Sequence, residues 1–339
     1  MNRVMAKVVK IDSVGDIAGA DSIECAKVGG WNVVVKKGEY SAGDLAVYCE
    51  IDSWIPHDLA PFLSKGQEPK EYNGVKGNRL RTAKLRGQLS QGLLLSRYSA
   101  LDNVGEIHVG MDCTNLLGIQ KYDPPMPAQL AGEAVGLFPS FIQKTDQERI
   151  QNLVPELDTL SNNHRWEVTE KLDGSSITVF LNQGEFGVCS RNLQLRETEG
   201  NSFWKVVRHF DIEAKMRSLN LDGIAIQGEL VGEGIQGNPY KIKGQTMYVF
   251  DIFNIKEGGY CTGLERVRIV NALGLNHVPI IINSFVLDQF EGNVDNILEY
   301  ADGKSAIADC IREGVVFKSC NTPDVSFKAI SNRFLLKEK

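Results

Sequence analysis

The sequence lacks any apolar run long enough to cross a membrane. A helix needs about 18 consecutive apolar residues to span a bilayer, no run in this chain reaches that length, and the mean hydropathy is −0.18. Arg3 and Lys7 also place charge where a signal peptide has its apolar stretch. We therefore expect a cytoplasmic protein that makes no membrane contact.

The cysteines lack the close, paired spacing of a disulfide framework or a zinc knuckle. Their number is odd and no CxxC motif occurs. We expect them to be reduced and mostly buried, as is usual in a reducing compartment. The seven positions are Cys25, Cys49, Cys113, Cys189, Cys261, Cys310 and Cys320.

Two phosphate-binding motifs are present only in part. Residues 232–237 have the glycine spacing of a dinucleotide-binding loop, but Asn238 and Pro239 follow where that fold needs a helix N-terminus. Gly303-Lys304-Ser305 resembles the end of a Walker loop, yet Leu298 occupies its first glycine position. HExxH, EF-hand and GxSxG motifs are absent. These observations exclude the commonest nucleotide, zinc-protease and hydrolase classes.

Charge is spread unevenly along the chain. The net charge of −6 argues against a protein that coats nucleic acid without specificity. Between Lys70 and Arg97, however, there are seven basic residues and one acidic residue, Glu71. Such a strip is typical of a phosphate-backbone contact, and equally of a solvated loop.

The first third of the chain has the pattern of a small β-structure. Short runs rich in β-branched and aromatic residues occupy 6–11, 22–28, 31–36, 45–51 and 92–96, with an insertion at about 56–86 that carries the basic strip. Five such strands predict an OB-like barrel, with a sandwich as the alternative. Proline and glycine between about 115 and 139 indicate a linker. We place an OB-fold nucleic-acid-binding domain at 1–115 and a second domain at 116–339.

The second domain mixes strands and helices in an α+β order. Residues 176–181 and 186–190 flank a turn and predict a hairpin. Apolar residues at helical spacing predict a helix over 203–214, and Thr262 with Glu265 forms a capping box that opens another. Further strands are expected at 166–170, 224–231, 246–252, 314–319 and 325–329.

One short segment, Glu170-Lys171-Leu172-Asp173-Gly174, stands at the end of a predicted strand. A lone KxDG is weak, because composition alone produces it in some chains of this length. Its context is stronger, because polar clusters recur downstream at strand ends. They are Ser190-Arg191-Asn192, Gln227-Gly228-Glu229-Leu230, residues 248–253, residues 312–318 and Ser326-Phe327-Lys328.

This series of clusters resembles the covalent nucleotidyltransferase superfamily of polynucleotide ligases and capping enzymes. Within it, the chain is similar to ATP-dependent RNA ligases with an N-terminal OB domain, and residues 85–92 and 138–149 match that group as well. The resemblance implies an OB-like β-barrel followed by an adenylyltransferase domain of antiparallel sheets with flanking helices. It also implies joining of 3′-OH and 5′-phosphate ends through lysyl-AMP and an adenylated 5′ end.

Lys171 is the residue that the resemblance makes the nucleophile. Attack on the α-phosphorus of ATP needs an uncharged amine, whereas a free lysine has a pKa near 10.4. We expect neighbouring cations and a bound metal to lower that pKa. The resemblance places Asp173, Glu229 and Glu313 around ATP and Mg²⁺ or Mn²⁺, because a metal is the physical reason to gather carboxylates near a polyphosphate. Taken alone, each of the two glutamates also has the minor interpretation of a surface acid.

The resemblance also assigns the remaining nucleotide contacts. Arg191 and Lys318 would contact the α-phosphate or the incoming 5′-phosphate, and Lys328 would neutralise charge as pyrophosphate leaves. Phe253 would stack on adenine, with Phe250 as the alternative, although each is also a plausible core residue. Arg149 and Lys144 would reach the β- and γ-phosphates, and Glu170 and Gly174 complete the cofactor-binding set.

One position departs from the family pattern. Many ligases carry a second lysine two residues after the position of Lys328, and here Ile330 stands there. Ile330 cannot hold the α-phosphate, so Lys318 or another cation must do so.

The expected partner is RNA or a nicked RNA/DNA duplex, bound by a monomer through Arg79, Arg81, Lys84 and Arg86. Three alternatives remain open from the sequence. The first is a DNA ligase or a GTP-dependent capping enzyme, although these usually carry the OB domain after the catalytic domain. The second is a non-catalytic sensor of nucleic-acid ends, and the third is a scaffold protein.

Overall fold

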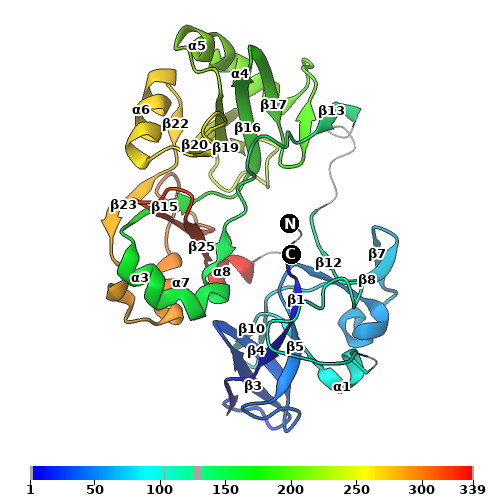
Figure 1. The fold of residues 1–339 in the computed structure, drawn as a ribbon. Coiled ribbons are helices and arrows are strands. Elements are labelled where there is room, and N and C mark those ends of the chain that lie inside the picture. Colours follow the sequence, from blue (N-terminus) through cyan, green and yellow to red (C-terminus); the bar gives the residue numbers. More distant parts are fainter. Residues whose placement is uncertain (1–2, 103, 125–131, 338–339) are drawn as a thin grey trace. The chain divides into compact units, whose positions relative to one another are not determined.

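The computed structural model describes residues 3–102, 104–124 and 132–337. The chain forms two compact units, one on each side of residues 125–131 (Figure 1). Part of the expected linker therefore lies outside the described residues. Among the described residues, no helix is both long and apolar enough to span a membrane.

The first unit is built mainly from short strands. Val8, Val47, Ile55 and Leu95 come from separate strands and pack into one core. The strands form four small sheets in the orders β1-β5-β11, β2-β3-β4, β12-β6-β8-β7 and β10-β9. Their bounds are β1 Ala6–Lys10, β2 Ser13–Asp16, β3 Ile23–Val28, β4 Trp31–Lys36, β5 Leu45–Cys49, β6 Ser53–Pro56, β7 Lys70–Tyr72, β8 Val75–Arg79, β9 Ala83–Leu85, β10 Gln88–Ser90, β11 Leu93–Ser96 and β12 Gln120–Lys121, with η1 His57–Leu59, η2 Pro61–Ser64 and α1 Arg97–Ala100.

The first unit extends beyond the boundary expected after residue 115. Gln120 and Lys121 form β12, which pairs with Trp54 and Ser53 of β6. These residues complete a sheet of the first unit, so the boundary predicted from the proline and glycine content comes too early.

The second unit contains a large sheet and a smaller one. The large sheet has the order β13-β18-β17-β16-β19-β20-β21, with β22 also paired to β20. Val206 of α4, Met216 of α5 and Val270 of α6 pack in one core with Leu230 and Met247 of the sheet. Figure 1 shows these helices on one side of the sheet. The bounds are β13 Ala134–Leu137, β16 Ser175–Asn182, β17 Glu185–Cys189, β18 Leu193–Leu195, β19 Ile224–Gly232, β20 Gln245–Asn254, β21 Gly259–Tyr260, β22 Asn276–His277, α4 Ser202–His209, α5 Ile212–Ser218 and α6 Gly263–Leu273.

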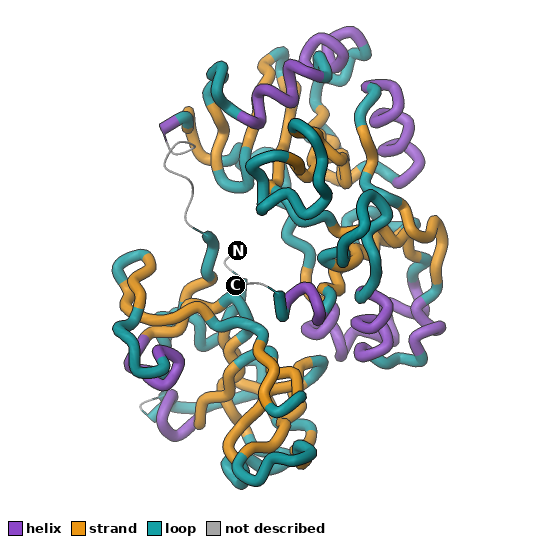
Figure 2. The backbone as a smooth tube through the Cα atoms, turned by 180° about the vertical axis from the view of Figure 1, so that it is seen from behind, coloured by secondary structure: helices purple, strands orange, loops and turns teal. Residues whose placement is uncertain are grey.

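The smaller sheet has the order β14-β25-β24-β15-β23. Its apolar face packs against Leu157 of α3 and Ile297 of α7, and Figure 2 shows helices and loops gathered around the strands of this unit. Chain segment 172–174 leads from β15 in this sheet directly to β16 in the large one. The bounds are β14 Glu148–Arg149, η3 Ile150–Glu156, α3 Leu157–Asn163, β15 Trp166–Lys171, β23 Ile280–Phe285, η4 Leu287–Phe290, α7 Val294–Ala301, β24 Gly314–Ser319, β25 Ser326–Ile330 and α8 Asn332–Leu335.

The helix expected over 203–214 is divided in two. Phe210 ends α4, and Asp211 adopts a left-handed conformation with φ of 51° before α5 begins. A left-handed residue cannot continue a right-handed helix, so the chain turns there. The capping box of α6 forms as predicted, and Gly274 ends that helix with φ of 65°.

The α+β class is confirmed. In the second unit, described strands pair antiparallel except for β14 with β25 and β20 with β22. This arrangement brings the end of β15 next to the start of β24.

Candidate active site

Lys171 ends β15 opposite Gly314, the first residue of β24. Glu313 immediately precedes that strand, and Lys171 Nζ donates to Glu313 Oε2 at 2.7 Å. The lysine side chain is 26% exposed and the glutamate side chain 16%. The amine is therefore reachable by a ligand and is held by its ion pair with Glu313 at the junction of the two sheets.

The surroundings of Lys171 are acidic rather than basic. Burial alone would lower the pKa of its amine, but the negative charges of Glu313, Glu229 and Asp173 outweigh burial and raise the pKa above its ordinary value. The expectation that neighbouring cations lower this pKa is wrong for the ligand-free protein. Without a counter-charge for these carboxylates, the amine is protonated and is not a nucleophile.

Glu229 lies on β19, paired with Ser176 of β16. Burial, together with repulsion from Glu313 and Asp173, raises the pKa of its carboxyl to about 8, against the opposing attraction of Lys171. Three carboxylates that repel one another around one amine are the donor set that a divalent cation relieves.

Gly174 sits in the turn between β15 and β16 because no larger residue fits. A Cβ at this position would lie 2.4 Å from the Leu230 carbonyl oxygen and 2.8 Å from Glu229 Cγ. The close approach of backbone to β19 places Glu229 beside the Lys171 segment. The predicted importance of this glycine therefore has a steric cause.

Tyr240 is a site residue that sequence reasoning missed. Its hydroxyl accepts a hydrogen bond from the Asp173 amide at 2.6 Å, and its ring is buried against Leu172 and Val231. The tyrosine belongs to the chain segment between β19 and β20, far from Asp173 in sequence. It fixes the turn that carries Asp173.

A second missed residue, Asp146, joins two of the predicted phosphate contacts. Its carboxylate lies 3.5 Å from Lys328 Nζ and 3.8 Å from Arg191 Nη2. Arg149 pairs with Lys328 in the parallel contact of β14 with β25 and is buried. Lys144 Nζ donates to Asn192, the neighbour of Arg191, at 2.9 Å. The structure thus gathers these cations, and Asp146 holds two of them.

Lys318 lies apart from the cations gathered at Asp146 and has partners of its own. Its amine forms an ion pair with Asp251 and donates to the Phe250 carbonyl at 2.6 Å. Both charged side chains are 6% exposed, and burial lowers the pKa of Lys318 to about 8. We therefore propose that Lys318 has a structural role, because its amine is buried together with its anionic partner. Ile330 is buried too, paired with Gly314.

The adenine-stacking assignment also changes. Phe253 is 4% exposed and packs with Phe180 and Tyr260, so its ring is a core element. Phe250 instead joins the cluster that contains Leu172, and Lys318 Nζ lies 5.8 Å from its ring centroid. Phe250 is therefore the better placed of the two aromatic candidates.

Glu170 is buried, as few carboxylates are. Its Oε2 accepts a hydrogen bond from the Ala306 amide at 2.7 Å, whereas its Oε1 has no hydrogen-bond partner among the described residues. A buried acceptor without a donor is costly in a folded protein. A ligand with a donor group at this place would remove that cost.

The carboxylates do not form a closed metal cage. Among the described residues, no three His, Cys, Asp or Glu side chains meet as a preformed metal centre. Mg²⁺ usually takes one or two carboxylates together with waters and substrate phosphates. The set of Asp173, Glu229 and Glu313 fits that mode rather than a cage made by the protein alone.

The basic strip of the first unit is only partly available. Arg79 Nη2 lies 2.5 Å from Asp52 Oδ1, and the guanidinium stands over the ring of Tyr122 at 5.2 Å from its centroid. With these internal partners, Arg79 is less available for a nucleic-acid contact than the exposed residues of the strip. Arg81, Lys84 and Arg86 are exposed.

A family model for RNA ligase matches residues 164–330, and a model for an OB-fold domain matches residues 5–97. The OB fold expected for the first unit is thereby confirmed. A search among curated proteins found no match.

Solved structures of an RNA ligase from Naegleria gruberi are 44% identical to this chain in sequence. An aspartate-to-alanine variant in its apo form has a TM-score of 0.91 and covers 100% of this chain and 99% of its own. A lysine-to-methionine variant with AMP and Mn has a TM-score of 0.91 and covers 99% of both chains. A lysine-to-alanine variant with ATP and Mn has a TM-score of 0.90, covering 98% of this chain and 99% of its own. This chain belongs to the RNA ligase family.

Proposed function

We propose that the protein joins RNA ends in an ATP-dependent reaction through a lysyl-AMP intermediate. The Lys171 amine attacks the α-phosphorus of ATP, the bond to the β-phosphate oxygen breaks, and pyrophosphate leaves. AMP then passes to a 5′-phosphate, and a 3′-OH attacks that adenylated end and releases AMP. The observation that carries the proposal is the reachable Lys171 amine, held among three carboxylates at the junction of the two sheets.

The first step requires Lys171 to lose its proton. Glu313 holds the amine in the ligand-free protein, and its attraction keeps the proton in place. Asp173, Glu229 and Glu313 would hold a divalent cation, which supplies positive charge that offsets both the carboxylates and the triphosphate. With the carboxylates so engaged, the Lys171 pKa falls and the amine becomes nucleophilic.

The cations near Asp146 fit the phosphate groups. Arg149 and Lys328 lie on adjacent strands, and Lys328 and Arg191 share the Asp146 carboxylate. A phosphate offers the same charge and hydrogen-bond acceptors as that carboxylate. We propose that ATP phosphates, and later the 5′-phosphate, take the place of Asp146 as the partner of these side chains.

Glu170 and Phe250 favour adenine as the base. The exocyclic amine of adenine is a donor that would satisfy Glu170 Oε1, whereas guanine has an acceptor at the equivalent ring position. Phe250 offers an aromatic face in the same region, beside Leu172. We infer that ATP is preferred over GTP.

The RNA partner follows from family membership, and its finer form is part of the proposal. We propose that the substrate is RNA or a nicked RNA/DNA duplex. Monomeric state and cytoplasmic location stay predictions, to be measured by light scattering and by cell fractionation.

The test is covalent labelling. The protein is incubated with α-labelled ATP or GTP and Mg²⁺, denatured, and examined for label on the chain. We expect label from ATP, little from GTP, and none in Lys171→Ala, because the amine that forms the bond is absent. Label that persists in the alanine variant, or a folded protein that takes none from ATP, would contradict the mechanism.

A further inference from the structure

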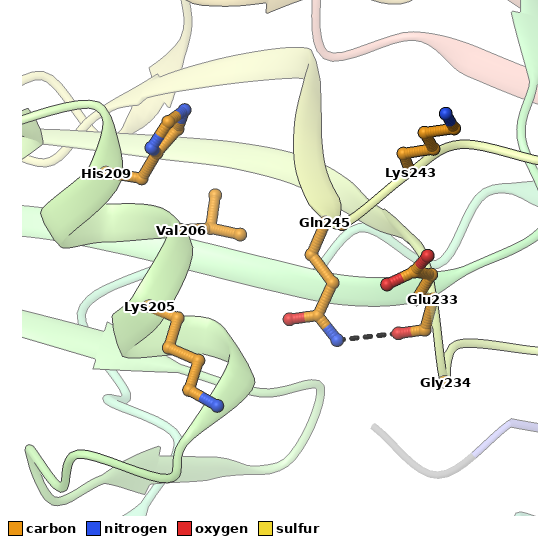
Figure 3. Close-up of a pocket in the computed structure, with 8 residues that line it drawn as sticks. Lys205, Val206, His209, Glu233, Gly234, Lys243 and Gln245 are labelled. Atoms are coloured by element: carbon orange, nitrogen blue, oxygen red, sulfur yellow. Dashed lines mark hydrogen bonds between the residues drawn. The ribbon is translucent and has the colours of Figure 1, made fainter.

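A groove lies beside the end of the large sheet, separate from the residues described above. It has a volume of about 750 Å³, and its walls come from α4 and from the two ends of the loop between β19 and β20. Figure 3 shows Lys205 and His209 on the helix side, and Glu233 and Lys243 on the loop side. Lys205, His209 and Lys243 are exposed, and Val206 is buried beneath them.

The loop ends that line this groove are fixed by backbone contacts. The Glu233 amide donates to the Gly244 carbonyl at 2.7 Å, and a Cβ at Gly232 would lie 2.2 Å from that same oxygen. Gln245 Nε2 donates to the Glu233 carbonyl at 2.7 Å (Figure 3). Gly232, the first glycine of the incomplete dinucleotide motif, thus allows the two ends of the loop to approach closely.

The groove is on the α4 side of the large sheet. Val206 packs in the core that includes Leu230 and Met247. Leu172, next to the nucleophile, instead packs with Val231 and Tyr240 in a different cluster. The same loop therefore lines the groove at its ends and reaches Asp173 through Tyr240.

We propose that this groove binds a backbone phosphate of the RNA substrate at a distance from the ends being joined. Lys205 and His209 line it from α4 and Lys243 lines it from the loop side, and Glu233 is the one acid among the lining residues. Two lysines on opposite walls suit a chain of phosphates that passes through the groove. The groove is open and exposed, as a polymer that enters from solvent requires.

The inference rests on the RNA-joining function proposed above, and the test separates the two. In the full-length protein, Lys205→Ala/Lys243→Ala removes two positive charges from the groove. Lys256→Ala/Lys304→Ala is the matched control, because those lysines are exposed elsewhere on the same unit. Three readouts are compared: lysyl-AMP formation from ATP, affinity for a long nicked RNA duplex, and the slope of log affinity against log salt.

We expect the groove variant to form lysyl-AMP at the normal rate but to bind the long duplex about tenfold more weakly. Its salt slope should become shallower by about 1 to 2, since each lost phosphate contact removes close to one unit. Lys205→Arg/Lys243→Arg should restore both values. RNA affinity and salt slope equal to those of the control would overturn the proposal, and a change in ATP use instead would assign the groove to the nucleotide. Absence of lysyl-AMP in the unmodified protein would count against the function and not against the groove.

Discussion

At the scale of single residues, the sequence predicts the reacting groups but not their partners. Lys171, Glu229 and Glu313 sit in clusters that can be found by their order along the chain. Tyr240 carries no such signal, and Asp146 lies within the matching segment 138–149 without being marked in it, because the roles of both arise from contacts with Asp173 and Lys328, residues distant in sequence. Contacts of this kind depend on the fold and cannot be found from local pattern.

The raised pKa of Glu229 makes stability depend on pH. The unfolded chain releases this proton near the ordinary value of 4.5, and the folded protein only at about 8. Between these values the folded state holds more protons, so the free energy of unfolding falls as pH rises. Glu229→Gln should remove much of this decrease in the free energy of unfolding. Urea denaturation between pH 4.5 and about 8, in the absence of metal, measures the effect.

The control for this prediction is Glu299→Gln, an exposed acid on α7. It should leave the pH dependence of stability as it is in the unmodified protein. If the free energy of unfolding changed equally with pH in the unmodified protein and in both variants, the pKa of the Glu229 carboxyl would not be raised.

At the scale of elements, the sequence predicts the positions of the strands well. It predicts less well which side chains of a strand lie on the side of the active site. Strands 31–36 and 314–319 match β4 and β24, because alternation and flanking turns mark them clearly. Phe250, and not Phe253, is the better placed candidate for adenine stacking, and this difference from the expectation has a specific cause. Gln227 pairs with Asp251 but Gly228 with Val249, so Phe250 is the extra residue of a bulge that shifts the alternation of β20. No local feature of the sequence marks this bulge.

Buried ion pairs connect the two sheets of the second unit. Lys318 of β24 pairs with Asp251 of β20, and Arg266 of α6 pairs with Glu167 of β15. Each joins an element of the small sheet to an element packed in the large one. The sheets that hold Lys171 and Glu229 are thereby kept in a fixed relation.

Breaking one such pair should destabilise the protein strongly. Lys318→Met leaves Asp251 charged and buried without its partner, a change that typically costs about 3–5 kcal/mol. Adding Asp251→Asn should recover most of that loss, since the unpaired charge is removed. Denaturant midpoints measure both effects.

Lys304→Met serves as the comparison, because its ion pair with Asp309 is exposed and contributes little. If Lys318→Met kept full stability and lost only lysyl-AMP formation, the phosphate role first expected for Lys318 would be correct after all.

At the scale of the whole molecule, the chain divides its tasks between two units. The residues proposed for adenylation all lie in the second unit, and the remaining exposed charges of the basic strip lie in the first. The sequence predicts both units from pattern, but it misplaces their boundary because β12 is only two residues long. A strand that short has no periodicity to detect.

This division predicts separable defects. Arg81→Ala/Lys84→Ala/Arg86→Ala should leave lysyl-AMP formation unchanged and weaken RNA binding, with a salt slope shallower by about 3 if each side chain contacts one phosphate. Filter binding of nicked RNA at several salt concentrations measures the affinity and its salt slope. Lys10→Ala/Lys36→Ala/Lys37→Ala removes the same charge from exposed positions of the same unit and should have little effect. Equal losses in the two variants would indicate a general charge effect rather than a binding strip.

The ion pair between Lys171 and Glu313 also has a consequence for the ligand-free protein, because it keeps the amine protonated. A lysine that keeps its proton does not react with the aldehydes, thioesters and acyl phosphates of metabolism. On the proposed mechanism, the amine becomes nucleophilic only when ATP binds together with a divalent cation that offsets the carboxylates. In the ligand-free protein, Lys171 Nζ is therefore unreactive. The carboxylates that keep it protonated are the same ones proposed to hold the divalent cation during the reaction.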